Sequence, residues 1–228
     1  MTAKVAIITG CSRGIGAGLA AAYRARGWAV VASAHAIMPS QDPDLLTVAA
    51  DIAEPATGAL IVDAALERFG RIDTLVNNAG VFISKPFTDY TAEDYALMVG
   101  VNLTGFFWLT QRVIAEMATR YGGHVVNITT TLAGYASSGE LAVLAALTKA
   151  GLTAAARSLA VEYASYGIRV NAVSPGVIQP AGSYDDPGDR LPPPGQVSDV
   201  VDGVLFLESS PHITGKILHI DGGQAAGH

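Results

Sequence analysis

The earliest residues in the chain with a chemical role are three glycines, Gly10, Gly14 and Gly16, which follow an apolar stretch and precede an alanine-rich one. A strand that enters a helix through such a turn points free backbone N–H groups and the positive end of a helix dipole at one place, where an anion can bind. Gly10 allows the tight turn, Gly14 lets a phosphate approach the backbone, and Gly16 lets the helix pack on the strand. The sequence therefore predicts a dinucleotide-binding loop. The full run is Thr9-Gly10-Cys11-Ser12-Arg13-Gly14-Ile15-Gly16.

The elements that must position this loop can be read from the hydrophobic pattern. Apolar runs of strand length occur at 4–9, 29–34, 45–49, 74–77, 124–129, 168–174 and 216–220. Helical segments lie between most of them, at 15–26, 56–69, 92–121, 141–166 and 197–208. This alternation predicts an α/β fold: a single doubly wound, Rossmann-type domain over residues 1–228, with a seven-stranded parallel sheet and helices on both faces.

Composition narrows the classes of partner. The 228 residues carry a formal net charge of -6, which disfavours nucleic acid and anionic membranes. The most apolar stretch, 141–161, contains Lys149 and Arg157, which is typical of a buried helix rather than of a membrane span. The single cysteine, Cys11, cannot form an intrachain disulfide and is interpreted as a small filler. We expect no secretory leader and a cytoplasmic protein.

One segment, 179–195, interrupts the regular pattern because it is rich in proline and aspartate. Proline at this density excludes a regular helix and predicts an exposed loop. Loops after the carboxyl ends of strands border the ligand crevice in such sheets. The segment is therefore either a lid over that crevice or a plain surface connection.

Further motifs follow the later strands in a fixed order. They are Asp51-Ile52, Asn77-Asn78-Ala79-Gly80, Asn102, Lys149, Pro175-Gly176, and the closing Ile213-Thr214-Gly215 and Asp221-Gly222-Gly223. Together with the glycine loop, and over essentially the whole chain, these motifs resemble the short-chain dehydrogenase/reductase family. The resemblance implies a nicotinamide dinucleotide cofactor, a small-molecule substrate and no metal.

The resemblance also implies where the cofactor is held. The glycine loop would hold the pyrophosphate and adenosine ribose, the end of the third strand the adenine, and the segment after the sixth strand the nicotinamide. At the place where the family usually has a threonine that touches the carboxamide, this chain has Pro180, which offers neither a hydroxyl nor an N–H. The implied contacts are Gly10, Ser12, Arg13, Gly14, Ile15, Gly16, Asp51, Ile52, Asn78, Ala79, Gly80, Lys149, Pro175, Gly176 and Ile178.

The choice between NADP(H) and NAD(H) depends on the end of the second strand. An acidic side chain there would bind the ribose 2′-hydroxyl and repel a 2′-phosphate. This chain has Ser33-Ala34-His35-Ala36, without an acid, and Arg13 adds a cation on the same side. Both features favour NADP(H), with His35 as a further donor or as an ordinary surface histidine.

The catalytic set departs from the family pattern. The family uses a tyrosine as proton donor and a lysine four residues later, because positions four apart share one helix face. Lys149 is present, and Ala145 stands where the tyrosine would be. Asn102 matches the asparagine that the family uses in a proton path. An alanine methyl cannot act as an acid or base, so the usual donor is missing.

The family's serine, which orients the substrate carbonyl, is also replaced. Counting from Asn127 assigns Thr130 to this role, and Thr130 keeps a hydroxyl. Counting back from Lys149 gives Leu132 instead, so the loop is about two residues longer than usual and Thr131 is an alternative.

Three routes could supply the missing proton. The phenol of Tyr135 could turn inward, although packing or exposure explains that tyrosine as well. A water held by Asn102 and Lys149 could relay a proton. A conjugated or quinone-like substrate could need no strong acid. Because a lost general acid typically costs about 10²–10⁴ in rate, we expect weak or specialised turnover.

Two classes of function follow. The first is an oxidoreductase that transfers hydride to or from a small carbonyl, alcohol or conjugated substrate with an atypical proton donor. The alternative is a catalytically weak or inactive NADP(H)-binding sensor or scaffold. Because the family pairs its long helices, here 92–121 and 141–166, we expect a homodimer or homotetramer.

Overall fold

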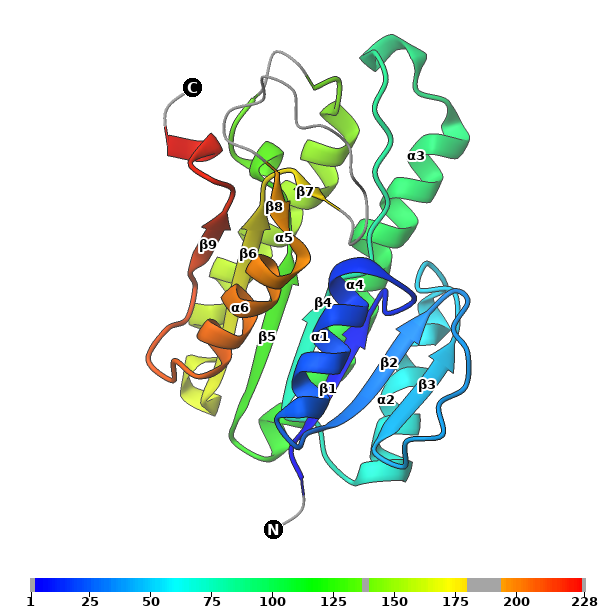
Figure 1. Ribbon diagram of the computed structural model, residues 1–228, viewed down its shortest axis with the longest axis vertical. Helices are drawn as coiled ribbons and strands as arrows, with labels where there is room; N and C mark the ends of the chain where they lie inside the picture. The colour runs from blue at the N-terminus through cyan, green and yellow to red at the C-terminus, as the bar shows by residue number, and fades with distance from the viewer. Residues whose placement is uncertain (1–2, 137–139, 180–193, 227–228) are drawn as a thin grey trace.

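The computed structural model describes residues 3–136, 140–179 and 194–226, and its centre is one parallel sheet (Figure 1). The strand order is β3-β2-β1-β4-β5-β6-β9, which is the predicted seven-stranded, doubly wound arrangement. All neighbouring strands pair in parallel, so their carboxyl ends meet at one edge. The strands are β1 (Val5–Thr9), β2 (Ala29–Ala34), β3 (Leu45–Ala49), β4 (Thr74–Asn77), β5 (Gly123–Ile128), β6 (Ile168–Pro175) and β9 (Ile217–Ile220).

Helices cover both faces of the sheet, as predicted. On one face, α1 (Gly14–Ala25) and α6 (Val197–Glu208) pack side chains such as Leu19 and Val204 into one apolar cluster. On the other face, α2 (Pro55–Phe69), α4 (Gly105–Thr119) and α5 (Val143–Glu162) share a second cluster, which includes Ile61. The central strands are buried on both faces, which explains their continuous apolar runs.

The predicted helix over 92–121 differs from the structure in its middle. It is divided into α3 (Ala92–Val99), a π-helical turn η2 (Gly100–Thr104), and α4. A π-helical turn carries one residue more than an α-helical turn, so it changes the direction of the side chains that it carries. Asn102 lies in this turn and is fully buried. The hydrophobic periodicity of the sequence indicates a long helix here but does not reveal the π-helical turn.

The other boundaries differ by a few residues. The helix predicted over 141–166 begins at Val143 and ends at Glu162, followed by the 3₁₀ turn η4 (Ala164–Tyr166) and Gly167 at φ +67°. The predicted ends of β1, β5, β6 and β9 each shift by one residue. Three further 3₁₀ turns are η1 (Phe87–Asp89), η3 (Thr131–Ala133) and η5 (Gln224–Ala226).

The predicted lid over 179–195 lies largely outside the described residues, and Pro180 lies there too. Its two ends form a short parallel pair that the sequence did not predict, β7 (Ile178–Gln179) with β8 (Gly195–Gln196). Within the described ranges, no helix combines the length and the apolar character needed to cross a bilayer.

Candidate active site

The glycine loop joins β1 to α1 at the carboxyl edge of the sheet, and each glycine is required for a different reason. Gly10 and Gly14 have φ values of +72° and +58°, which side chains rarely adopt. A Cβ on Gly16 would collide with the carbonyl oxygen of Gly10, so α1 could not begin this close to the strand. A Cβ on Gly14 would meet no atom within 4 Å, so this side of the loop is open to a ligand.

The amino end of α1 fits a diphosphate. Its N-cap, Arg13, makes no side-chain capping bond in the described structure, which leaves the first N–H groups facing outward. Ser12, Arg13 and Gly14 are exposed, whereas Ile15 packs against the apolar cluster under α1. Cys11 is buried, and this burial raises the pKa of its thiol to about 12, as expected for a filler and not for a reactive thiolate.

A hydrogen-bonded junction fixes the glycine loop to the end of β4. The Thr9 hydroxyl accepts the N–H groups of Asn78 and Ala79 at 3.0 and 2.9 Å. The Asn78 amide in turn donates to the carbonyl of Thr9 at 2.8 Å and to that of Gly10 at 3.3 Å. The sequence did not predict this role for Thr9, although a hydroxyl residue at the start of the glycine loop could have indicated it.

The predicted adenosine side lies next to this junction. His35 is exposed at the end of β2, and Ala50, which precedes Asp51, bonds back to Ala34 at 3.0 Å. The Asp51 carboxylate accepts the N–H of Ala53 at 2.9 Å, so it shapes its own turn. Ile52 is half-buried and packs where a Cβ on Gly105 would collide with it.

Lys149 is a buried cation at the same edge. Its Nζ donates to the carbonyl of Ile128, at the end of β5, at 2.9 Å. A Cβ added to Gly80 would lie 2.7 Å from Nζ, so the segment after β4 passes directly over the ammonium. Burial lowers the pKa of Lys149 to about 8, because desolvation disfavours the charged form. The sequence-predicted Gly80 and Lys149 therefore belong to one site.

The side chain of Asn102 forms hydrogen bonds with the backbone of the segment after β4. Its Oδ1 accepts the N–H of Val81 at 2.9 Å, and its Nδ2 donates to the carbonyl of Val81 at 3.1 Å. The second Nδ2 proton goes to the Thr148 hydroxyl at 3.0 Å, next to Lys149 on α5. Thr148 is a second residue that sequence reasoning missed. The π-helical turn thus ties the segment after β4 to the lysine helix.

The two threonine alternatives lie in different environments. The Thr131 hydroxyl is buried and donates to the carbonyl of Pro175 at 3.4 Å. Thr130 is half-buried, and its Oγ1 accepts the N–H of Leu132 at 3.4 Å, which leaves its own proton available. Thr130 follows Ile128, the partner of Lys149, by two residues and is the more exposed of the two threonines.

Ala145 lies one turn before Lys149 on α5 and is 1% exposed. It belongs to a small apolar cluster with Met98, Ala142 and Leu144. Side chains from the loops after β4 and β5 cover this cluster, and they are Val81, Ile83, Tyr90 and Leu132. The methyl group therefore faces packed side chains and not an open crevice.

Tyr135 lies away from this cluster. Its ring meets the ring of His219 on β9 edge to face, with centroids 5.8 Å apart, and it is 47% exposed. The segment after β6 also turns toward β9: Gly176 donates to Ile220 at 3.0 Å. A Cβ on Gly176 would lie 3.0 Å from Asp221, so Pro175 and Gly176 lie close against the closing segment.

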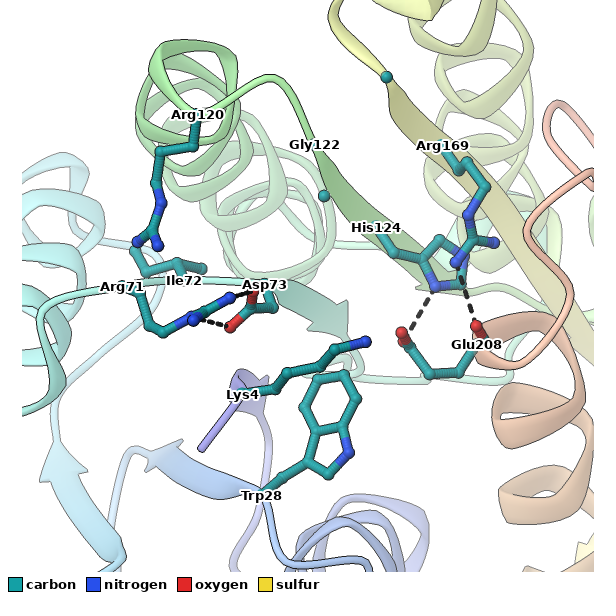
Figure 2. Close-up of a pocket in the computed structure, with 12 residues that line it drawn as sticks. Lys4, Trp28, Arg71, Ile72, Asp73, Arg120, Gly122, His124, Arg169 and Glu208 are labelled. Carbon is teal, nitrogen blue, oxygen red and sulfur yellow. Dashed lines mark hydrogen bonds and ion pairs between the residues drawn. The ribbon is translucent and has the colours of Figure 1, made fainter. Parts of the chain in front are cut away.

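A separate cavity of about 350 Å³ lies at the opposite edge of the sheet, near the amino ends of β1, β4, β5 and β6 (Figure 2). His124 on its wall is buried and bonds to Glu208 at 3.0 Å. The Glu208 carboxylate also accepts the hydroxyls of Tyr23 and Thr74 at 3.0 and 2.8 Å. This polar network joins α1, β4, β5 and α6 and lies far from the glycine loop.

At the carboxyl edge, the loops after β1, β4, β5 and β6 thus bring an open glycine loop and a desolvated lysine together, an arrangement typical of dinucleotide sites of Rossmann type. Comparison with known proteins agrees. A model of the short chain dehydrogenase family matches residues 4–185. The chain belongs to the short-chain dehydrogenase/reductase family of oxidoreductases.

Individual relatives match over almost their whole length. The oxidoreductase UcpA of Escherichia coli K12 is 33% identical over 98% of this chain and 95% of its own. A 3-oxoacyl-[acyl-carrier-protein] reductase of Synechocystis is 33% identical over 98% and 97%.

Two solved structures also superpose closely on this chain. The structure of ElxO with NADP bound has a TM-score of 0.89 at 26% identity and covers all of both chains. The structure of a 3-ketoacyl-(acyl-carrier-protein) reductase from Brucella melitensis complexed with NADH has a TM-score of 0.86 at 28% identity, over 98% and 99%.

Proposed function

We propose that the chain is an NADP(H)-dependent oxidoreductase that transfers hydride to or from a small carbonyl or alcohol, or to a conjugated acceptor. This proposal rests on one observation: the glycine loop at the amino end of α1, which has no side-chain cap, and the buried Lys149 lie at the same edge of the sheet. Relatives that reduce oxoacyl groups and neighbours solved with NADP or NADH support it.

The residues at the site suit such a cofactor. The open N–H groups of the glycine loop would hold the diphosphate, and exposed Arg13 and His35 would meet a 2′-phosphate. The absence of an acid at the end of β2 favours NADP(H) over NAD(H). When bound, the nicotinamide supplies or accepts the hydride. Lys149 would hold its ribose, and the Thr130 hydroxyl would orient the substrate oxygen.

The proposed active site lacks the family's phenol. Position 145, one turn before Lys149, carries a methyl group that neighbouring apolar side chains cover. A general acid typically contributes about 10²–10⁴ in rate, so turnover should be slow or restricted to acceptors that stabilise negative charge themselves.

The covered methyl at position 145 also favours a second function, an NADP(H)-binding sensor or scaffold without turnover. Titration with NADPH and NADH by fluorescence, followed by a panel of ketones, enones and quinones, separates the two. Tight NADPH binding with oxidation of NADPH by at least one acceptor supports the enzyme. Tight binding with no oxidation across the panel supports the sensor, and no binding contradicts both.

A further inference from the structure

We propose that Lys149 is itself the proton donor of the reaction, delivering its ammonium proton to the substrate oxygen directly or through one water. This inference rests on the proposed oxidoreductase function and names the residue that replaces the missing phenol. Among the described residues at the carboxyl edge of the sheet, the groups that carry a transferable proton differ in how they are bonded.

The aromatic ring of Tyr135 contacts a different strand from the one that Lys149 contacts. Its ring packs on His219 of β9, whereas Lys149 bonds to the end of β5 and lies under Gly80 after β4. Tyr90, the tyrosine in the cluster around Ala145, donates its hydroxyl proton to the carbonyl of Ile83 at 2.8 Å. Among the contacts of the described residues, neither phenol bonds to Lys149.

Asn102 cannot supply the proton through its side chain. Both protons of its amide are used, one by Val81 and one by Thr148, and its oxygen accepts the N–H of Val81. Its contribution is to position Val81, and with it Gly80, over Lys149. Asn102 is therefore a positioning residue in this site.

Lys149 keeps protons to give. The ammonium has three N–H donors: its bond to Ile128 uses one, the proposed bond to the nicotinamide ribose would use a second, and one is left for the substrate oxygen. Gly80, which passes over the ammonium, places no side chain against it. Thr130, two residues beyond Ile128, carries a hydroxyl proton that no described group accepts. Burial lowers the pKa of this amine to about 8, which lets it lose and regain a proton near neutral pH.

Titratable side chains of the described segments after β4 and β5 have partners other than Lys149. After β4, Lys85 is paired with Asp94 at 2.5 Å. After β5, Tyr135 lies against His219, whose own ion-pair contact is Asp221 at 3.9 Å. Among the described residues, no carboxylate forms an ion pair with Lys149, so desolvation determines its protonation.

The step balances in atoms and charge. In reduction, the carbonyl carbon gains a hydride from the reduced nicotinamide, the C=O π bond breaks, and the oxygen takes a proton from Nζ. Lys149 is left as a neutral amine, and water returns its proton. In oxidation, the neutral amine accepts the proton of the alcohol.

The test compares protonation of Lys149 with the pH profile of reduction. The side-chain pKa, measured without cofactor by NMR of isotope-labelled lysine and assigned with Lys149→Arg, is expected at about 8. In the wild type, kcat/KM for an acceptor found in the panel should fall about tenfold per pH unit above that value, because the ammonium is lost. Oxidation should increase over the same range.

The variants separate proton donation from cofactor binding. Lys149→Arg keeps a cation that does not release its proton, so the rate of reduction should fall about 10²–10⁴-fold. The decrease of kcat/KM at high pH, the alkaline limb of the profile, should vanish. NADPH should still bind. Lys149→Gln is a smaller second variant with the same expectation for turnover. Lys85→Arg, at a paired surface lysine, is the matched control and should keep the limb.

Several results would overturn the inference. An NMR pKa near that of a free lysine, an alkaline limb that persists in Lys149→Arg, or loss of the limb in Tyr135→Phe would each do so. Activity without such a limb leaves the oxidoreductase function standing and removes only the role of Lys149. NADPH binding without any turnover by the wild type overturns both proposals.

Discussion

At the scale of single residues, a pair of glycines allows the cost of backbone strain to be distinguished from an effect on cofactor binding. Gly14 and Gly70 both have positive φ, +58° and +72°, and a Cβ on either would meet no atom within 4 Å. Alanine at either position costs about 1–2 kcal/mol of backbone strain. Of the two, only Gly14 lies in the loop that we propose holds the diphosphate.

We therefore predict that Gly14→Ala and Gly70→Ala lower the free energy of unfolding by similar amounts, measured by urea titration. Calorimetry should show that Gly14→Ala weakens NADPH binding roughly tenfold or more, about the value of one charge-assisted hydrogen bond, while Gly70→Ala does not. Equal binding by the two variants would show that the dinucleotide is not held at this loop.

Arg13 is the residue that should distinguish the two cofactors. A charge-assisted bond to a 2′-phosphate is worth about 1.5–3 kcal/mol. Fluorescence titration of Arg13→Ala should therefore show a Kd for NADPH raised roughly 10–100-fold, with the Kd for NADH little changed. Arg26→Ala, an exposed arginine just past the other end of α1, is the control. A parallel loss of both cofactors in Arg13→Ala would contradict the assignment.

At the scale of elements, the network around His124 makes stability depend on pH at the amino edge of the sheet (Figure 2). The N–H of Lys216 fixes Asn171 Oδ1 as an acceptor, so Asn171 Nδ2 donates to His124 Nε2 at 3.1 Å. His124 must then be neutral, and its protonated Nδ1 donates a hydrogen bond to the Glu208 carboxylate. Burial lowers the pKa of His124, which favours the same state.

Because the folded state holds His124 neutral, the unfolded chain binds a proton that the folded chain does not. Stability should therefore fall as pH decreases below about 6.5, the ordinary histidine value, with a slope of up to about 1.4 kcal/mol per pH unit from this group. Urea titrations from pH 7.5 to 5 should show a weaker slope in His124→Asn. His212→Asn, at an exposed histidine, should retain the wild-type slope. An unchanged slope in His124→Asn would refute this account.

The sequence predicts most elements because buried parallel strands are apolar on both faces and the amphipathic helices keep one period. It does not predict the π-helical turn at Asn102, which depends on bonds to Val81 and Thr148 from distant segments. The same limit applies at the site. The glycine loop and Lys149 can be read from spacing, whereas the bonds of Thr9 to Asn78 and the packing of Ala145 appear only when β1, β4, β5 and α5 come together.

At the scale of the whole molecule, we propose that the chain assembles through α4 and α5. Both helices carry large exposed apolar side chains, among them Phe107 at 52% and Leu147 at 62% exposure. Light scattering after size exclusion should show a dimer or tetramer for the wild type and smaller species for Phe107→Glu or Leu147→Glu. Phe87→Glu, in η1, is the control at a more exposed phenylalanine, 71% exposed, that lies on neither helix. A wild-type monomer would contradict this proposal.

The central claim for the molecule is that its glycine loop binds NADPH and that hydride reaches a substrate without a phenol at position 145. The most direct measurement is a single turnover with NADPH deuterated on one face of nicotinamide C4, followed by mass spectrometry of the acceptor. We predict that deuterium from one of the two faces appears in the product with the wild type and is reduced to a trace with Lys149→Gln. Saturated NADPH binding with no deuterium transferred from either face to any acceptor of the panel would contradict the account.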